Sequence, residues 1–335
     1  IQSNKEEYLR RREKYKIKVP ATDLEKSEII LSKLEGSIYR DEDNVMLFNE
    51  EKKIWEVDRK PYNKVNIKVT DILVPYYIEL AEKLNLILSK MDPELKEFQW
   101  TKENYITATA NLKQVRNATG ISNVKNVLLP RIPYYGKEMK FDQMKKNYFV
   151  FRNKAFDFET RKEIEVKKED LITLFADYDY KEPTDQEKKE LDDLLNSIFP
   201  DPEVRDSYLS ILRNSCTANR IEKFILANGD GRNGKGVLNE LMACVLGNHY
   251  FYMANPSTIC QPIKSGADPS LASLHKKRMV IFSEPSDDSI NIETINAITG
   301  NDVLNARGLY SSNTDCYLNL TGIIECNKCQ SKRDR

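Results

Sequence analysis

The chain has 335 residues, of which 40% are hydrophobic and 31% are charged. This length exceeds one small hydrophobic core and predicts two or three domains, and the apolar content excludes disorder throughout the chain. Lys and Arg together number 52, as do Asp and Glu, so any binding of nucleic acid must come from a local basic patch or from a ring of subunits.

The apolar and cysteine patterns narrow the class of protein further. The longest apolar stretch, residues 72–78, is interrupted by Pro75 and is far shorter than the roughly 18 residues of a membrane span, so we expect no membrane partner. The cysteines all follow residue 215 and do not form a disulfide scaffold, which predicts a reducing, intracellular compartment. A first residue other than Met predicts a piece of a longer protein. The cysteines are Cys216, Cys244, Cys260, Cys316, Cys326 and Cys329.

The first third of the chain predicts helices. Residues 5–18 hold seven basic and three acidic residues, and they form either a solvated helix or linker or a basic arm that grips a phosphate backbone. Apolar residues recur at helical spacing over residues 71–91, before an Asp-Pro pair that ends the helix. A second helix is predicted over residues 101–117, closed by Gly120.

The residue composition changes in the middle of the chain. Residues 148–151 and 156–158 are rich in aromatic side chains and predict short strands, and their rings serve either as core packing or as platforms for stacking bases. Thr184 and Glu187 form a capping box for a helix that ends before Pro200. Another helix is predicted over residues 202–214. Residues 161–200 carry twelve acidic and seven basic residues, which disfavours DNA on that surface.

A glycine-rich loop lies between an apolar run at residues 224–227 and a helix predicted over residues 237–246 and closed by Gly247. Strand, glycine loop and helix are the context of a phosphate loop, in which backbone N–H groups converge on phosphate oxygens and Lys235 neutralises the β- and γ-phosphates. A tight connection is the alternative interpretation. The predicted nucleotide-binding residues are Gly229, Asp230, Gly231, Arg232, Asn233, Gly234, Lys235, Gly236 and Val237.

The metal side of this predicted site departs from the usual pattern. Gly236 stands where a phosphate loop ordinarily has the Ser or Thr that ligates Mg²⁺, so Mg²⁺ needs another ligand or a water. Further along, the apolar run 279–282 ends at Ser283, Glu284 and Pro285. A carboxylate at the tip of a buried strand can reach Mg²⁺ or the attacking water. Glu284 is therefore predicted either to bind the metal or to activate water.

Cys326 and Cys329 have the spacing of half a zinc knuckle or of a redox motif. No second pair lies at zinc spacing, and the histidines are His249 and His275. Two ordinary thiols at the end of a core strand are the preferred interpretation.

Four segments, taken in order and spacing, resemble a known family. Residues 229–235, 278–285, 298–302 with 306–310, and 323–327 resemble motifs A, B, B′ and C of superfamily 3 helicases. The similarity is to the poxvirus-type branch, shared by large DNA viruses and by phage and plasmid primase-helicases. Upstream, residues 141–142, 151–157 and 168–173 resemble the domain that precedes the ATPase there, and the similarity covers roughly residues 44–328.

The resemblance implies an α/β fold with an AAA+-like P-loop ATPase core that assembles as a hexameric ring. Such a ring uses ATP and Mg²⁺ to translocate on single-stranded or forked DNA. By this similarity Lys235 holds the phosphates, Glu284 serves Mg²⁺ and water, and Asn327 senses the γ-phosphate. Arg307 and Tyr310 belong to the segment that faces DNA in the channel.

Some positions depart from the family pattern. Asn301 replaces the second glycine of a Gly-Gly-Asp run, Asn296 stands where a basic residue is common, and Lys328 follows Asn327 where a proline is expected nearby. A further strand and an arginine-bearing segment are expected after the chain's last residue. The trans-acting arginine finger is therefore Arg333, Arg335 or a residue outside this chain.

We therefore predict a helical region or linker over residues 1–120, an α+β collar over 121–220 and the ATPase core over 221–335. The predicted function is the ATP-dependent helicase portion of a replicative, viral primase-helicase, in the host cytoplasm or at a viral replication site. One alternative is a nucleotide-binding ring that acts as a scaffold or clamp with weak hydrolysis. Another is that the N-terminal part recruits a viral DNA polymerase or processivity factor. No primase site is assigned.

Overall fold

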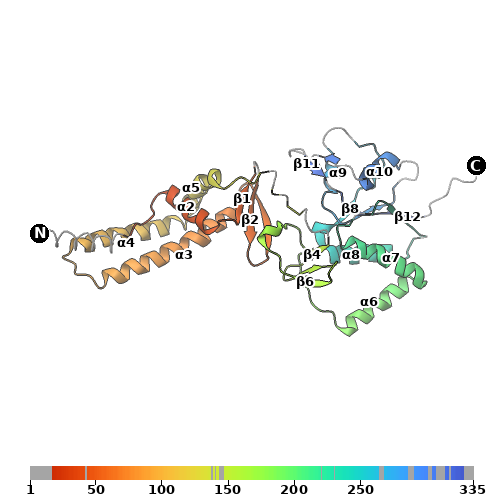
Figure 1. Ribbon diagram of the computed structural model, residues 1–335, viewed down its shortest axis with the longest axis horizontal. Coiled ribbons are helices and arrows are strands. Elements are labelled where there is room, and N and C mark those ends of the chain that lie inside the picture. The colour runs from red at the N-terminus through yellow and green to blue at the C-terminus, as the bar shows by residue number, and fades with distance from the viewer. Residues whose placement is uncertain are drawn as a thin grey trace, which may run out of the picture. The chain divides into compact units, whose positions relative to one another are not determined.

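The computed structural model describes residues 17–41, 44–136, 139, 141–142, 147–219, 221–229, 231–263, 268–285, 290–300, 304–306, 314–316 and 318–327 (Figure 1). The chain divides into two compact units, Ile1–Met139 and Lys140–Arg335. The finer division at residues 120 and 220 stays a prediction. Within the described ranges, each helix is too short or too polar to span a bilayer.

Unit 1 combines helices with a small antiparallel sheet of order β1-β2-β3. Its long helix α3 starts eight residues before the predicted helix and continues through Pro75. The three strands are not apparent from the sequence pattern; in β2, for example, the middle four residues are all buried and show no alternation. The elements are α2 (Asp23–Lys33), β1 (Ile38–Arg40), β2 (Asn44–Asn49), β3 (Ile54–Arg59), α3 (Asn63–Leu88), α4 (Lys96–Gln114), α5 (Ala118–Leu128) and η1 (Leu129–Arg131).

The core of unit 1 forms around one face of α3. Buried residues recur along this helix at intervals of three or four, which places them on a single stripe. The stripe packs with buried residues from α2, α4 and α5, including Ile30, Ala108 and Val124. The stripe consists of Val65, Val69, Leu73, Tyr77, Ala81 and Leu84.

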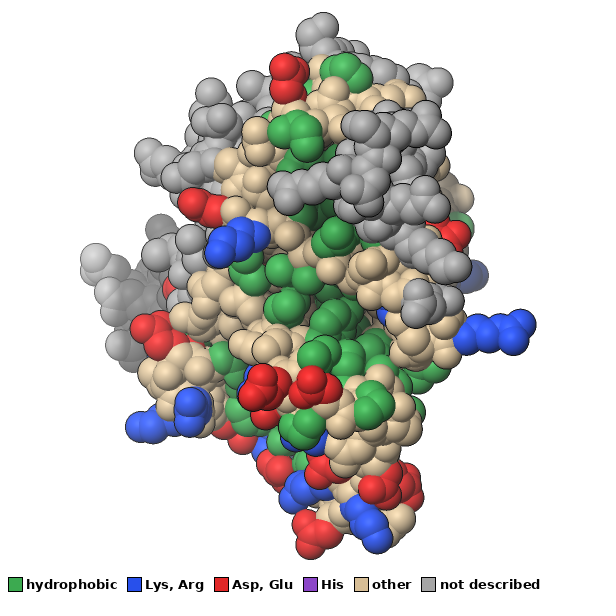
Figure 2. Space-filling view, turned by 90° about the vertical axis from the view of Figure 1, so that its right-hand side faces the viewer, with side chains coloured by type: hydrophobic (Ala, Val, Ile, Leu, Met, Phe, Trp, Pro, Cys, Tyr) green, Lys and Arg blue, Asp and Glu red, His purple; other side chains and the backbone are tan. Residues whose placement is uncertain are grey.

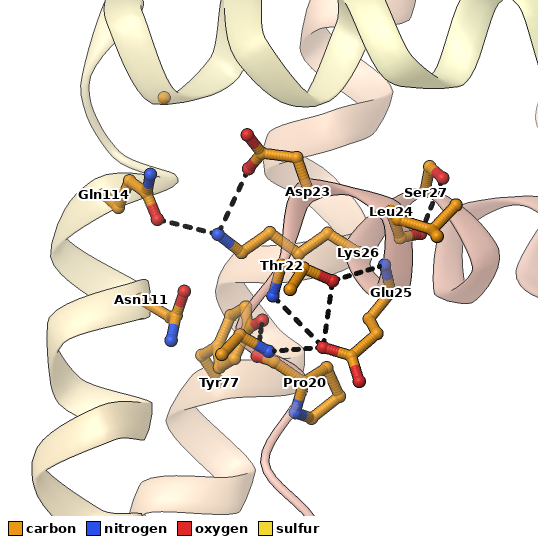
Figure 3. Close-up of polar contacts among 12 residues, drawn as sticks. Pro20, Thr22, Asp23, Leu24, Glu25, Lys26, Ser27, Tyr77, Asn111 and Gln114 are labelled. Atoms are coloured by element: carbon orange, nitrogen blue, oxygen red, sulfur yellow. Dashed lines mark hydrogen bonds and ion pairs between the residues drawn. The ribbon is translucent and has the colours of Figure 1, made fainter.

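A buried lysine joins α2 to the end of α4 (Figure 3). The side chain of Lys26 is fully buried, and its Nζ donates to Gln114 Oε1 at 2.7 Å and to the Asp23 carboxylate at 3.4 Å. Nearby, the Tyr77 hydroxyl donates to the carbonyl of Pro20 at 2.6 Å. The buried ammonium thus depends on an amide oxygen that comes from 88 residues further along the chain.

We expect Gln114→Ala to lower the free energy of unfolding by about 1 to 3 kcal/mol, because the Lys26 ammonium would lose its shortest hydrogen bond while staying buried. Urea denaturation of the full chain measures this change. Lys113→Ala is the matched control, since Lys113 is an exposed neighbour on the same helix, and its effect should stay within about 0.5 kcal/mol. Equal effects of the two substitutions would contradict the assignment.

The first part of unit 2 contains the antiparallel sheet β4-β5-β6 and two helices. The capping box predicted at the start of α6 is confirmed, because Thr184 Oγ1 accepts from the Glu187 N–H at 3.2 Å and the Glu187 carboxylate accepts from the Thr184 N–H at 2.7 Å. The helix predicted over residues 202–214 is also confirmed. The elements are β4 (Tyr148–Val150), β5 (Ala155–Asp157), β6 (Lys162–Ile164), η2 (Lys168–Asp170), α6 (Asp185–Ile198) and α7 (Pro202–Ser215).

The aromatic residues of this part pack with one another. Phe149 is 2% exposed, and its ring lies 4.9 Å from that of Phe151 and 5.3 Å from that of Tyr250. Phe151 in turn contacts Tyr178 and Tyr180. These contacts favour the core-packing interpretation over base stacking.

The second part of unit 2 is a parallel four-stranded sheet of order β7-β12-β9-β8 with helices between its strands (Figure 1). The strands predicted at residues 224–227 and 279–282 are present, and α8 is interrupted at the predicted end, where Gly247 has φ +64°. A mixed α/β fold is thereby shown for this unit. The elements are β7 (Phe224–Gly229), α8 (Lys235–Tyr250), β8 (Phe251–Ala254), η3 (Pro256–Ile259), α9 (Pro269–Ala272), β9 (Met279–Ser283), α10 (Ile292–Thr299), β10 (Leu304–Ala306), β11 (Thr314–Cys316) and β12 (Thr321–Asn327).

Two polar side chains fasten the parallel sheet to the part of unit 2 that precedes it. Arg278, which is buried just before β9, donates to the carbonyls of Cys216 at 2.6 Å and Tyr148 at 2.5 Å. Asp142 accepts from Lys276 Nζ at 2.8 Å and from the Thr173 hydroxyl at 2.6 Å. These contacts hold the two parts of unit 2 together as one packed body.

The surface carries both apolar and charged groups. Figure 2 shows hydrophobic side chains gathered in a band on one face, with acidic and basic side chains intermingled toward one end. Exposed apolar residues in unit 2 include Leu191 in α6, Val204 in α7 and Leu226 in β7. The chain has equal numbers of basic and acidic residues, and on this face the two kinds are interspersed. The face therefore has no electrostatic potential of a single sign.

Candidate functional site

The ends of three parallel strands meet at one edge of the sheet. Asn327 of β12 pairs in register with Gly229 of β7, and Glu325 of β12 pairs with Ser283 of β9. Because these strands run in the same direction, the segments that follow them all leave from this edge, where ligands bind in open α/β sheets.

The glycine loop occupies this edge with an unusual backbone. Gly231, Arg232 and Gly234 have φ values of +80°, +50° and +86°, in the left-handed region that glycine adopts without strain. A Cβ at position 229 would lie 2.0 Å from Asn233 Nδ2 and 2.9 Å from Lys235 Nζ. The loop thus folds back over Gly229 so closely that a side chain there would collide with it.

Helix α8 begins at Lys235, directly after this loop. The Leu238 N–H donates to the Gly234 carbonyl at 3.1 Å, and the N–H groups that precede it in the first turn have no acceptor within the helix. These free donors and the positive end of the helix dipole favour an anion. The loop and helix together therefore have the chemistry of a phosphate-binding site.

A chain of hydrogen bonds joins the three residues predicted to be catalytic. Lys235 Nζ donates to Asn327 Oδ1 at 3.2 Å, and Asn327 Nδ2 donates to Glu284 Oε1 at 2.6 Å. Glu284 has φ +52°, and its backbone N–H donates to the Glu325 carbonyl at 2.8 Å. The structure thus brings together side chains from α8, β12 and the turn after β9, and a strained backbone at such a position is a feature of functional sites.

A pocket of about 410 Å³ opens at this edge. Six of the loop residues predicted to bind a nucleotide line it, whereas Val237 is exposed in the first turn of α8 and does not. Gly229 lies beneath the loop, and Asp230 falls outside the described residues. The lining comprises Gly231, Arg232, Asn233, Gly234, Lys235, Gly236, Asn239, Glu240, Ala243, Phe251, Met253, Ser283, Glu284, Glu325, Cys326 and Asn327.

A second polar group in this pocket, formed by Asn239, Glu325 and Ser283, was not predicted from the sequence. Asn239 Nδ2 donates to Glu325 Oε1 at 2.9 Å, and Ser283 Oγ lies 3.5 Å from Glu325 Oε2. Beside them, burial raises the pKa of the Tyr208 hydroxyl to about 12, and the charge of Glu325 adds to this shift. One sequence signal could have found the group, namely an acidic residue that directly follows the apolar pair Ile323 and Ile324 within a strand.

Several predicted residues cannot be placed. Arg307, Tyr310, Arg333, Arg335 and Cys329 lie outside the described residues. Cys326 is buried at the end of β12, where its Sγ donates to Asn228 Oδ1 at 3.6 Å, as expected for an ordinary thiol. Among the described residues, no three His, Cys, Asp or Glu side chains are grouped so that they could hold a metal ion.

The residues of the pocket fit a nucleotide together with Mg²⁺. Lys235 and the start of α8 supply positive potential for a phosphate chain. Mg²⁺ usually takes only one or two carboxylates, because phosphate oxygens and waters complete its coordination. Glu284 and Glu325 both line the pocket, so the absence of a hydroxyl at Gly236 does not leave it without oxygen ligands.

Comparisons with known proteins find viral relatives. The chain is 29% identical to a protein of Acanthamoeba polyphaga mimivirus over 250 residues, which are 72% of this chain and 25% of that protein. It is 30% identical over 176 residues to a protein of Invertebrate iridescent virus 3, covering 50% of this chain and 18% of the relative. It is 34% identical over 118 residues to a protein of Frog virus 3 (isolate Goorha), covering 34% and 12%. Each relative carries the name "Putative helicase".

The chain spans a quarter or less of the length of these relatives. No protein-family model matches it. Among solved structures, it is similar to an apo structure of the C-terminal region of NrS-1, with 12% identity and a TM-score of 0.46 over 92% of this chain and 58% of that one. A second form of that region aligns with 16% identity and a TM-score of 0.34, covering 42% and 32%.

Proposed function

We propose that unit 2 is the ATP-hydrolysing core of a viral DNA helicase of the superfamily 3 type. The observation that carries this proposal is the chain of hydrogen bonds from Lys235 through Asn327 to Glu284, set at the edge of the pocket beside the glycine loop. The similarity to three viral proteins named as helicases supports it. The order β7-β12-β9-β8 supports an AAA+-like core, because it sets the strand that ends in Asn327 beside the strand that leads into the loop.

In this proposal each of the three hydrogen-bonded residues, Lys235, Asn327 and Glu284, has a separate role. Lys235 neutralises the phosphates, and its bond to Asn327 places the amide beside the γ-phosphate. Asn327 in turn orients the Glu284 carboxylate, which accepts a proton from the attacking water or contacts the metal. Mg²⁺, when bound with the nucleotide, neutralises phosphate charge and polarises the bond that breaks.

The wider assembly belongs to the same proposal. A neutral chain can hold a polyanion if a homo-hexameric ring repeats one basic site in a central channel. Arg307 and Tyr310 are the proposed contacts to single-stranded or forked DNA, with a trans-acting arginine supplied by Arg333, Arg335 or a segment beyond them. Unit 1 is the proposed contact for a viral polymerase or processivity factor, at a viral replication site.

The test is steady-state ATP hydrolysis by the full-length protein, with and without single-stranded DNA. We expect DNA to stimulate hydrolysis, and we expect Arg307→Ala to remove that stimulation while leaving nucleotide affinity unchanged. Its DNA affinity should depend less steeply on salt, by about 1 in the slope of log K against log salt. Arg213→Ala is the matched control, because Arg213 is exposed on α7, away from the pocket lining. Unchanged DNA binding in Arg307→Ala would remove this residue from the channel.

A second candidate function is a nucleotide-binding ring that acts as a scaffold or clamp with weak hydrolysis. The observation that favours it is Gly236, which gives the loop no hydroxyl for Mg²⁺. Under this alternative the protein binds nucleotide, but its hydrolysis does not exceed that of the variants Lys235→Ala and Glu284→Gln. The same assay therefore separates the two functions.

A further inference from the structure

Glu325 is a buried carboxylate with neutral partners. It is 5% exposed, and its two oxygens lie near the Asn239 amide, at 2.9 Å, and the Ser283 hydroxyl, at 3.5 Å. No Lys, Arg or His side chain forms an ion pair with it among the described residues. A buried carboxylate without a cation is costly, so its place in the wall of a pocket needs an explanation.

Asn239 is the neighbour of Glu325 in the pocket wall. This residue is also 5% exposed and lines the pocket, and its Oδ1 is buried without a hydrogen-bond donor among the described residues. A buried amide oxygen that lacks a donor within the protein is able to accept from a water or to bind an ion. Glu325 and Asn239 thus bring a carboxylate and an amide whose oxygen has no donor into contact in the pocket wall.

The third oxygen belongs to Ser283 at the tip of β9, opposite Glu325 in the sheet register. Mg²⁺ selects oxygen ligands, and the position after Lys235 supplies none because it is Gly236. Glu284, the neighbouring acid, already accepts a hydrogen bond from Asn327 at 2.6 Å. Glu325 accepts a hydrogen bond as well, but it has the oxygens of two neighbouring side chains, Asn239 and Ser283, beside it. This group of three is therefore the part of the pocket that can replace the missing hydroxyl.

We propose that Glu325, with Asn239 Oδ1 and Ser283 Oγ, forms the Mg²⁺ side of the nucleotide pocket. This inference rests on the proposed nucleotide binding and adds to it the residues that hold the metal. The acid would come from β12, the strand that also ends in Asn327, and not from the glycine loop. Glu284 would then be left to act on water.

The experiment measures the affinity of the full chain for the non-hydrolysable nucleotide AMP-PNP by calorimetry, in EDTA and in excess Mg²⁺. We expect Glu325→Gln to keep the affinity in EDTA and to lose about 10- to 100-fold of the gain that Mg²⁺ gives to the wild type. Electron paramagnetic resonance of Mn²⁺ in place of Mg²⁺ should show the same loss of bound metal. Glu222→Gln is the matched control, since Glu222 is exposed just before β7 and lies outside the pocket lining.

The outcomes separate this inference from the proposed function. A full Mg²⁺ gain in Glu325→Gln overturns the metal assignment, and so does an equal loss in Glu222→Gln. Wild-type binding that does not depend on Mg²⁺ overturns it as well. Wild-type protein that does not bind AMP-PNP in either buffer overturns nucleotide binding, and the inference with it. If Glu325→Gln fails to fold, Ser283→Ala decides: Ser283 is exposed, and a retained Mg²⁺ gain in that variant overturns the proposal.

Discussion

Lys235→Ala is expected to weaken nucleotide binding by about 1.5 to 3 kcal/mol, or roughly 10- to 100-fold, and to abolish hydrolysis. The ammonium makes a charge-assisted hydrogen bond to the phosphates in this proposal, and such bonds contribute about that much. The substitution also removes the donor that Asn327 Oδ1 uses at 3.2 Å, so the amide that orients Glu284 would be free to turn. Calorimetry with AMP-PNP and a steady-state hydrolysis assay measure the two effects.

Lys223→Ala is the matched control for this prediction. Lys223 is an exposed lysine just before β7, and it lies outside the pocket lining. The Lys223→Ala substitution removes the same positive charge but leaves the glycine loop unchanged, so the nucleotide affinity should stay at the wild-type value. Wild-type affinity in Lys235→Ala would show that the glycine loop is only a tight connection between β7 and α8.

Glu284→Gln is expected to slow hydrolysis by about 10²- to 10⁴-fold, the usual contribution of a general base, and to leave AMP-PNP affinity within about twofold of the wild type. The amide has the size of the carboxylate and can still accept from Asn327 Nδ2, so the geometry at 2.6 Å should survive. It cannot take a proton from water. Single-turnover hydrolysis, which is independent of product release, is the appropriate measurement.

Glu222→Gln serves as the control here as well, because it removes the same negative charge from an exposed residue outside the pocket lining. Hydrolysis in this variant should match the wild type. If Glu284→Gln hydrolyses ATP as fast as the wild type, two interpretations remain. If the wild type and the variant both hydrolyse ATP rapidly, Glu284 takes no part in the chemistry. If both rates are near zero, the result favours the scaffold function.

The sequence predicted those parts of unit 2 that depend on local patterns. The capping box at Thr184, the strand before the loop and the interruption at Gly247 are each determined by neighbouring residues. The residues Lys235, Glu284 and Asn327 were also predicted, the first two from motif chemistry and the third from a family resemblance. Whether they bind ATP and Mg²⁺ stays a prediction, and so does the contact of Arg307 with DNA.

Contacts between distant segments could not be predicted. The bond between Asn239 and Glu325 joins residues 86 positions apart, and it depends on β12 lying between β7 and β9. In unit 1, α3 begins eight residues before the predicted helix, because the buried residues Val65 and Val69 continue the stripe that packs in the core. Tertiary packing determines both the Asn239–Glu325 hydrogen bond and the extent of α3, and such packing cannot be derived from the local pattern of one sequence.

The central place of β12 divides the pocket into stiff and compliant parts. This strand is hydrogen-bonded along both sides, to β7 and to β9, so the backbone that holds Glu325 and Asn327 can shift only if the sheet itself deforms. The glycine loop and Glu284 have backbones in the left-handed region, at the ends of strands. In the proposed nucleotide cycle, any change of shape would therefore be taken up by the loop and by the turn at Glu284, with β12 as the fixed reference against which they move.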